Sequence, residues 1–248
     1  MDMRMPARMR PDERLPLYQQ LSDEMLARIA AGEWLPGTPI PSETELTKLH
    51  GVAIGTVRKA VDTLVQQGIL ERSHGRGTFV RRPQFAESFF RFFRQVSPTG
   101  NQPVPQSRIL TRSLELPPEA VRHSLALKKN EPTVYLTRER IIQEDRLFRE
   151  EIWLPKDRFS PLLDIDPTQF ANMLYPFYEE RCGQLIASAR ETLTIESADK
   201  HMAEFLGITP GEPVVAIERI ALGYDATPLE YRLSRGAAEG FRYQIDLR

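Results

Sequence analysis

Three short helix patterns and a glycine-tipped pair of strands follow one another early in this chain, and few folds accept that order in so few residues. The first helix is expected over residues 17–31, where apolar side chains recur at helical spacing. The second is short and begins after Ser42, because the Ser42 hydroxyl can cap the helix while Glu45 bonds back to the cap amide. This succession already indicates a small helical module at the start of the chain.

A third helix and a hairpin complete the module. The helix is predicted over residues 54–67, with apolar side chains on one face and Gly68 at its end. Strands at 69–72 and 78–80 flank a glycine-rich tip at 73–77. Three helices and such a hairpin make a winged helix-turn-helix, in which the third helix enters the major groove of DNA.

Side chains at the start of the third helix and in the hairpin have the chemistry to contact a duplex. Thr56 can bond a phosphate or a base edge, and the planar guanidinium of Arg58 matches guanine or phosphate. Arg76 at the hairpin tip suits the potential of a narrow minor groove, and the helix start at Ser42 offers phosphate donors. The residues expected at the DNA are Ser42, Thr44, Ala53, Ile54, Gly55, Thr56, Arg58, Lys59, Arg72, His74, Gly75, Arg76 and Gly77.

Four stretches of this module, LPLY at 15–18, GTPIPSE at 37–43, GTVRKA at 55–60 and GILER leading to GRGTFV at 68–80, make it similar to the GntR family of bacterial transcription regulators. The resemblance implies binding of a palindromic operator in double-stranded DNA by a homodimer, usually as a repressor. The family often has arginine where Thr44 stands, and serine then arginine where Ala53 and Ile54 stand. We therefore expect a different operator or a weaker affinity.

After the hairpin the pattern changes twice. Residues 83–106 are interrupted by prolines and are expected to form a linker, although four phenylalanines at 89, 90, 92 and 93 should pack on the second domain or on a partner. From 107 onward, strands are predicted at 108–114, 133–143, 147–154, 185–195, 213–222, 229–233 and 242–247, and helices at 118–125, 171–181 and 198–206. This order favours an α+β fold, an antiparallel sheet with helices on one side. The expected domains are thus 1–82 and 107–248.

Arg138 and Arg140 stand two residues apart in one predicted strand, which places both guanidinium groups on one face. Two arginines side by side are costly to bury without an anion, so a carboxylate or a phosphate is a natural partner. A solvated strand face, with Glu139 pointing the other way, explains the pattern equally well.

Residues 107–247 resemble the UTRA domain, the effector-binding domain of the HutC branch of the GntR family, whose fold is similar to that of chorismate lyase. The similarity rests on the strand with the two arginines, on EEIWLP at 150–155, on the helix around 174–175 and on PLEY at 228–231.

In relatives that bind sugar phosphates, side chains at matching positions hold the ligand. The resemblance gives these roles to Arg138, Arg140, Glu150, Tyr175 and Glu230. Met173 stands where those relatives have a serine, and Gly236 lies near the place of an expected tyrosine. The implied effector is therefore a small anion, either a sugar phosphate or a carboxylic acid.

Composition and absent motifs exclude other classes. The net charge is −1, with 33 Lys and Arg against 34 Asp and Glu, so the whole chain is not a polycation. Cys182 is the single cysteine, which excludes an internal disulfide and a multi-cysteine metal site. No catalytic, metal or cofactor motif is legible, so none of these is expected. The chain has no apolar run near the ~20 residues of a membrane span and no secretory signal, which indicates a cytoplasmic protein without membrane contact.

Two other functions stay open at this point. The likeness to chorismate lyase allows an enzyme that acts on a small acid, with the helical module as an accessory. The helical module could also bind protein in place of DNA, in which case its affinity would lack the steep salt dependence of a DNA complex.

Overall fold

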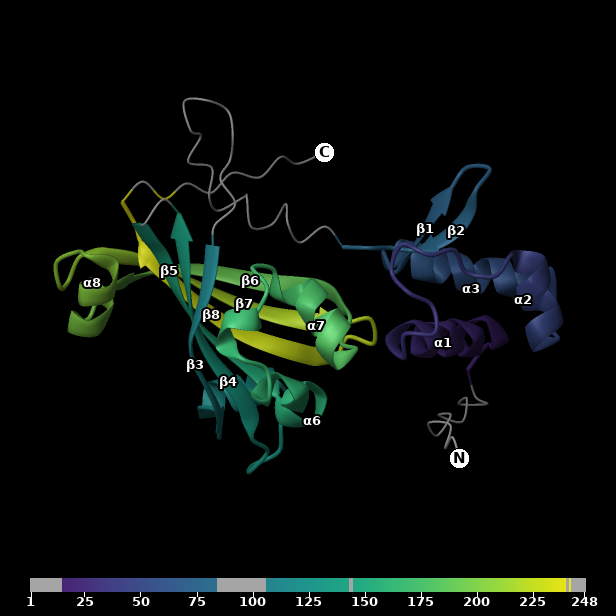
Figure 1. Ribbon diagram of the computed structural model, residues 1–248. Helices are drawn as coiled ribbons and strands as arrows, with labels where there is room; N and C mark the ends of the chain where they lie inside the picture. The colour runs from purple at the N-terminus through teal and green to yellow at the C-terminus, as the bar shows by residue number, and fades with distance from the viewer. Residues whose placement is uncertain (1–14, 84–105, 143–144, 240, 242–248) are drawn as a thin grey trace. The chain divides into compact units, whose positions relative to one another are not determined.

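The computed structural model describes residues 15–83, 106–142, 145–239 and 241. The chain divides into two compact units, Met1–Arg82 and Pro83–Arg248 (Figure 1). Most of the expected linker, with its phenylalanines, lies outside the described residues, and so does the strand expected at 242–247.

The first unit contains the three predicted helices, α1 (Leu17–Ala30), α2 (Glu43–His50) and α3 (Ile54–Gln66). Their apolar faces meet in one small core, since the spacing that predicted each helix also places its large side chains on one side. The fully or almost fully buried members are Leu21, Met25, Ile29, Leu46, Val57, Val61 and Leu64.

The ends of α2 follow the predicted capping chemistry. The Ser42 hydroxyl accepts a hydrogen bond from the Glu45 amide at 3.3 Å, and the Ser42 amide donates to Glu45 Oε2 at 2.8 Å. At the other end Gly51 adopts a left-handed conformation with φ of 65°, which glycine tolerates without strain. These two signals place a sharp turn between α2 and α3.

The wing is the hairpin of β1 (Leu70–Ser73) and β2 (Gly77–Val80), which pair antiparallel. Gly75 and Gly77 carry φ angles of 70° and 112° at the tip, where a residue with a side chain would be strained. The predicted hairpin is therefore confirmed.

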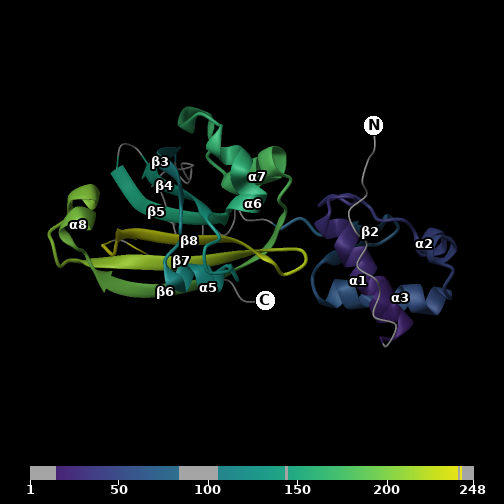
Figure 2. The ribbon, with the colours of Figure 1, turned by 90° about the horizontal axis from the view of Figure 1, so that it is seen from below.

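The second unit is built on a six-stranded antiparallel sheet with the order β3-β4-β5-β8-β7-β6 (Figures 1 and 2). The strands are β3 (Gln106–Glu115), β4 (Thr133–Ile142), β5 (Asp145–Pro155), β6 (Ile186–Ser197), β7 (Pro213–Gly223) and β8 (Pro228–Ala237). β8 extends four residues beyond the predicted end at 233, because it pairs with β7 as far as Ala237. The α+β prediction is confirmed.

The expectation that all helices lie on one side of the sheet is wrong. α5 (Glu119–Ser124) packs through Val121 against Trp153 of β5, whereas α7 (Leu174–Cys182) packs in the cluster that contains Ile152. Adjacent residues of a strand point to opposite faces, so α5 and α7 cover opposite faces (Figure 2).

Short helical elements connect the sheet to α7 and were not predicted. They are α6 (Lys156–Phe159) and two 3₁₀ turns at Ser160–Leu163 and Pro167–Gln169. α7 itself begins three residues later than predicted, because Phe170 has an extended backbone and its ring packs against Phe177 with centroids 5.1 Å apart. The third predicted helix is confirmed as α8 (Lys200–Leu206).

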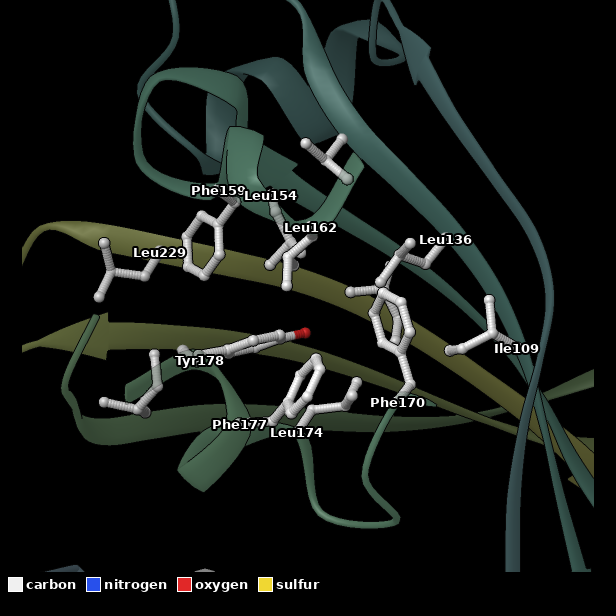
Figure 3. Packing of buried hydrophobic residues seen from close by; sticks show 14 residues of the cluster. Ile109, Leu136, Leu154, Phe159, Leu162, Phe170, Leu174, Phe177, Tyr178 and Leu229 are labelled. Carbon is white, nitrogen blue, oxygen red and sulfur yellow. The ribbon is translucent and has the colours of Figure 1, made fainter. Parts of the chain in front are cut away.

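The main core of the second unit lies between the sheet and α7 (Figure 3). Phe159, Leu162, Phe170, Leu174 and Phe177 face sheet residues such as Leu136 and Leu154 across this layer. Tyr178 belongs to the same cluster and is fully buried, so its hydroxyl needs a partner inside the protein.

Candidate functional site

The start of α3 presents its polar residues to solvent. Ala53, Ile54, Gly55 and Arg58 are exposed, and Thr56 is half-buried. Ala53 caps α3 with no side-chain hydrogen bond, so the first amides of the helix have no capping oxygen. A phosphate oxygen is the kind of group that binds at such a position.

Glu43 joins the two arginines that were assigned to DNA from separate elements. Arg58 Nε donates to Glu43 Oε2 at 2.7 Å, and Arg72 Nη2 lies 3.6 Å from Glu43 Oε1 and 2.8 Å from Asp62 Oδ1. The hydrogen bond and the charge of Glu43 raise the pKa of Arg58 above its ordinary value. Glu43 therefore holds a side chain of the helix and one of the wing near each other, both positively charged.

A hollow of about 690 Å³ lies between the start of α2 and the wing. Its lining includes the predicted DNA residues Ser42, Arg72, His74, Gly75, Arg76 and Gly77. Arg76 lies over the Phe79 ring at 5.5 Å from the centroid, which gives the tip arginine a support on the wing. The wing residues and the start of α2 thus share one surface.

Three predicted DNA residues are placed less directly. The Ser42 hydroxyl is used in the helix cap, as described above. The ammonium of Lys59 lies 3.9 Å from the ring centroid of Tyr18 in α1. Thr44 is exposed on α2.

In the second unit, Arg138 and Arg140 are 2% and 4% exposed, so the interpretation as a solvated strand face is wrong. Glu139 does point to the other face, but it is also buried, and Arg108 of β3 bonds to it. The strand therefore carries charge into the interior on both faces of the sheet.

Glu150 is the carboxylate opposite Arg138. The two residues are direct partners in the β4–β5 register, and Arg138 Nε donates to Glu150 Oε2. Glu150 also accepts from the Ser234 hydroxyl at 3.2 Å and lies 3.9 Å from Arg232 Nη1. Burial opposes ionisation of Glu150, but the charges of Arg138, Arg232 and Arg140 outweigh it and lower the pKa of Glu150 to about 2.

Glu230 is the second carboxylate and is fully buried. It accepts hydrogen bonds from the Tyr178 hydroxyl at 2.8 Å, the Tyr175 hydroxyl at 3.1 Å and Arg232 Nη2 at 2.7 Å. This contact satisfies the buried hydroxyl of Tyr178 seen in Figure 3. Burial and the nearby charge of Glu230 raise the pKa of Tyr178 well above its ordinary value, so the phenol stays protonated as a donor.

Arg219 and Arg232 are direct partners in the β7–β8 register and lie on the same face. Like charges placed opposite each other repel. Arg219 Nε donates to Glu191 at 2.5 Å, and the guanidinium carbons of Arg219 and Arg232 lie 6.0 and 5.5 Å from the Tyr175 ring centroid. The ring and the carboxylates offset part of this repulsion.

Arg140 lies beside the start of α7, where Arg140 Nη1 donates to the Asn172 carbonyl at 2.6 Å. Burial, followed by the charges of Arg138 and other arginines, lowers the pKa of Arg140 to about 9. A guanidinium does not deprotonate at neutral pH, so this shift measures how unfavourable the positive charge is here.

Together these residues form the arginine cluster, defined as Arg138, Arg140, Arg219, Arg232, Glu150, Glu191 and Glu230. It contains four guanidinium groups and three carboxylates. Within the described part of the chain, Arg138 Nη1 and Arg232 Nε are buried without a hydrogen-bond partner. The cluster thus has an excess of positive charge and of donors, which an added anion would balance.

The structure brings together all five residues that the resemblance assigned to the effector, and adds others. Arg232 and Ser234 follow Glu230 at a spacing of two, the same signal that singled out Arg138 and Arg140, and could have been found. Arg219, Glu191 and Tyr178 carry no local signal, since only the strand order and the packing of α7 bring them here. Met173 is 43% exposed and brings no hydroxyl.

A helix-turn-helix with an exposed wing, followed by a sheet domain with a buried charged cluster, is the architecture of a DNA-binding regulator with a ligand-binding domain. Residues 17–80 match the model of the bacterial regulatory proteins of the gntR family, and residues 101–242 match that of the UTRA domain. The chain belongs to the GntR family, in the branch with a UTRA domain.

Curated relatives agree over nearly the whole chain. The transcriptional repressor NagR of Bacillus subtilis is 28% identical over 94% of this chain and 96% of its own length. The repressor MngR of the mannosyl-D-glycerate transport and metabolism system of Escherichia coli is 26% identical over 94% of this chain and 95% of its own. The protein is therefore a transcription regulator, and the enzyme alternative is not supported.

Solved structures show the same fold. The ligand-binding domain of a GntR-family regulator from Bordetella bronchiseptica is 27% identical with a TM-score of 0.55, covering 58% of this chain and 92% of that one. PhnF from Mycobacterium smegmatis is 22% identical with a TM-score of 0.54, covering 94% and 99%. Among the described residues, no helix is long and apolar enough to cross a membrane, and no group of three His, Cys, Asp or Glu side chains could hold a metal.

Proposed function

We propose that this regulator binds a palindromic operator as a homodimer and that a small anion in the arginine cluster changes its operator affinity. Arg58 on α3 and Arg72 and Arg76 on the wing supply the contacts to DNA. A two-fold dimer presents two such heads, and their separation has to match about one helical turn of DNA. Any change in that separation changes the affinity.

The observation that carries the effector site is the charge imbalance of the arginine cluster. Four buried guanidinium groups face three carboxylates, and two donors stay without a partner among the described residues. One bound anion would supply the missing negative charge and accept from these donors.

Both a sugar phosphate and a carboxylic acid fit this chemistry. Met173 removes one hydroxyl donor at the start of α7, which weakens the case for a phosphate. One relative is named for mannosyl-D-glycerate, and glycerate is a carboxylate. We therefore place small carboxylic acids beside sugar phosphates as the effector class.

The site is tested by thermal denaturation of the full chain with a panel of sugar phosphates and small carboxylic acids. Arg140→Gln removes one guanidinium, and Arg158→Gln, an exposed arginine outside the cluster, is the matched control. A true effector raises the melting temperature of the wild type and of Arg158→Gln and fails to raise that of Arg140→Gln. An equal shift in all three proteins would place the anion elsewhere.

A further inference from the structure

β6 is an unusual edge strand because it is exposed on both faces. It is the last strand in the order of the sheet, next to β7 alone (Figure 2). All residues from 188 to 197 are exposed, including Leu193 at 40% and Ile195 at 60%. Its register with β7 runs without a break from Ser188 to Ser197. A long, regular and partly apolar edge is a template for pairing with another strand.

The opposite edge of the sheet does not offer the same template. β3 has a register shift between Ile109 and Thr111, which bends an edge and interrupts its row of backbone groups. The Ser107 amide already donates to Asn172 Oδ1 at 2.9 Å. Of the two edges, β6 is therefore the one suited to a partner strand.

The residues of β6 complement themselves in one antiparallel register. With Leu193 on a two-fold axis, Arg190 of one copy lies opposite Glu196 of the other, and Thr192 lies opposite Thr194. Opposite charges and pairs of threonines are both favourable across strands. Moving the centre by one residue pairs Arg190 with Thr194, or Thr192 with Glu196, and the contact between opposite charges is lost.

We propose that two copies of this chain pair through antiparallel β6 strands centred on Leu193, so that the two sheets become one. The occupant of the edge is thus a second copy, and the two-fold axis makes each Arg190–Glu196 contact twice. The proposal deepens the homodimer of the proposed function and rests on it.

This interface is joined to the arginine cluster by a single residue. Glu191 lies on β6, binds Arg219 of the cluster and falls opposite Ile195 of the second copy in the proposed register. An anion that draws Arg219 toward itself would alter the contact of Glu191 with Arg219, and with it the strand that forms the interface.

Cysteine cross-linking in the full chain tests the register, with Cys182→Ser removing the native thiol. Leu193→Cys places two thiols opposite each other, within reach of a disulfide, for which Cβ atoms need to be about 3.5–4.5 Å apart. Ile195→Cys is the matched control, because its two copies would be separated by four residues, or about 14 Å. Leu193→Cys should form a covalent dimer under mild oxidation, and Ile195→Cys should not.

Charge reversal tests the pairing itself by analytical ultracentrifugation. Arg190→Glu should raise the dimer dissociation constant at least about tenfold, since it replaces two attractive contacts with repulsive ones. Adding Glu196→Arg should restore most of the affinity. Glu196 also accepts from Arg235 at 2.9 Å, but Arg235 keeps Glu151 as a partner at 2.9 Å.

A dimer that is insensitive to Arg190→Glu, or that cross-links equally at Leu193→Cys and Ile195→Cys, overturns the interface while leaving the proposed function intact. A monomer at all concentrations overturns both the interface and the proposed homodimer. If residues of the same chain cover the edge, neither cysteine variant cross-links, and the proposal also fails. Operator binding and the response to anions are measured separately, so their loss would mark failure of the proposed function itself.

Discussion

Glu43 connects side chains that lie on different elements, and its effect is best measured at the level of the single residue. It holds Arg58 at 2.7 Å and lies 3.6 Å from Arg72. A DNA phosphate or base has to replace or share this carboxylate, which makes the contacts of the two arginines interdependent.

Arg58→Ala is expected to weaken operator binding by about 1–3 kcal/mol, because it removes a guanidinium from the start of α3. Fluorescence anisotropy with an operator duplex measures the loss. Lys128→Ala, which changes an exposed lysine of the second unit, is the control and should bind like the wild type. Equal affinity of Arg58→Ala and the control would remove Arg58 from the interface.

Glu150→Gln should destabilise the second unit by about 3–5 kcal/mol, because it leaves the buried Arg138 without its opposite charge. Urea unfolding of the full chain reports this as an earlier transition. Glu119→Gln is the control, since Glu119 has a side chain that is 91% exposed and forms a surface pair worth less than about 1 kcal/mol. Similar midpoints for the two variants would contradict the role given to Glu150.

Acid should destabilise the second unit through the same residue. The pKa of Glu150 is lowered to about 2 in the folded chain from 4.5, so the unfolded chain binds the proton first as the pH falls. The stabilisation is present above pH 4.5 and is lost progressively toward pH 2. Unfolding curves across this range should show a smaller pH dependence in Glu150→Gln than in the wild type, and identical slopes would contradict this reasoning.

At the level of single elements, α2 depends on its capping box. Ser42→Ala removes the oxygen that accepts from the Glu45 amide and should cost about 0.5–2 kcal/mol of stability in the first unit. Thr44→Ala, two residues along and exposed, should cost less. Chemical unfolding followed by circular dichroism compares the two, and a larger loss in Thr44→Ala would contradict the cap.

Elements with local signals were predictable from the sequence, and those that depend on distant partners were not. The capping box fixes the start of α2, and alternation places Arg138 and Arg140 on one face, both as the structure has them. The position of α5 depends on which face of the sheet has room for Val121, a question that its own periodicity does not answer.

The candidate site divides in the same way. Pattern alone left Arg138 and Arg140 equally open to burial and to solvent, because their environment is set by α7 and by strands far along the chain. β8 inserts between β5 and β7 and thereby brings Arg232 beside Glu150, an arrangement that only the strand order creates.

On the scale of the whole molecule, regulation requires that the anion site in one unit affects the DNA site in the other. The two sites are thermodynamically linked, so an anion that weakens operator binding must itself bind more weakly to the operator complex, by the same factor. Operator affinity should also fall steeply with salt, linearly on logarithmic axes, because the bound protein releases counterions from DNA phosphates.

The most direct test is the operator dissociation constant measured by anisotropy with and without each anion that stabilises the wild type. An anion that occupies the arginine cluster should change this constant about 5- to 150-fold in the wild type and leave it unchanged in Arg140→Gln. An anion that binds the cluster yet leaves operator affinity the same in both proteins would contradict the account.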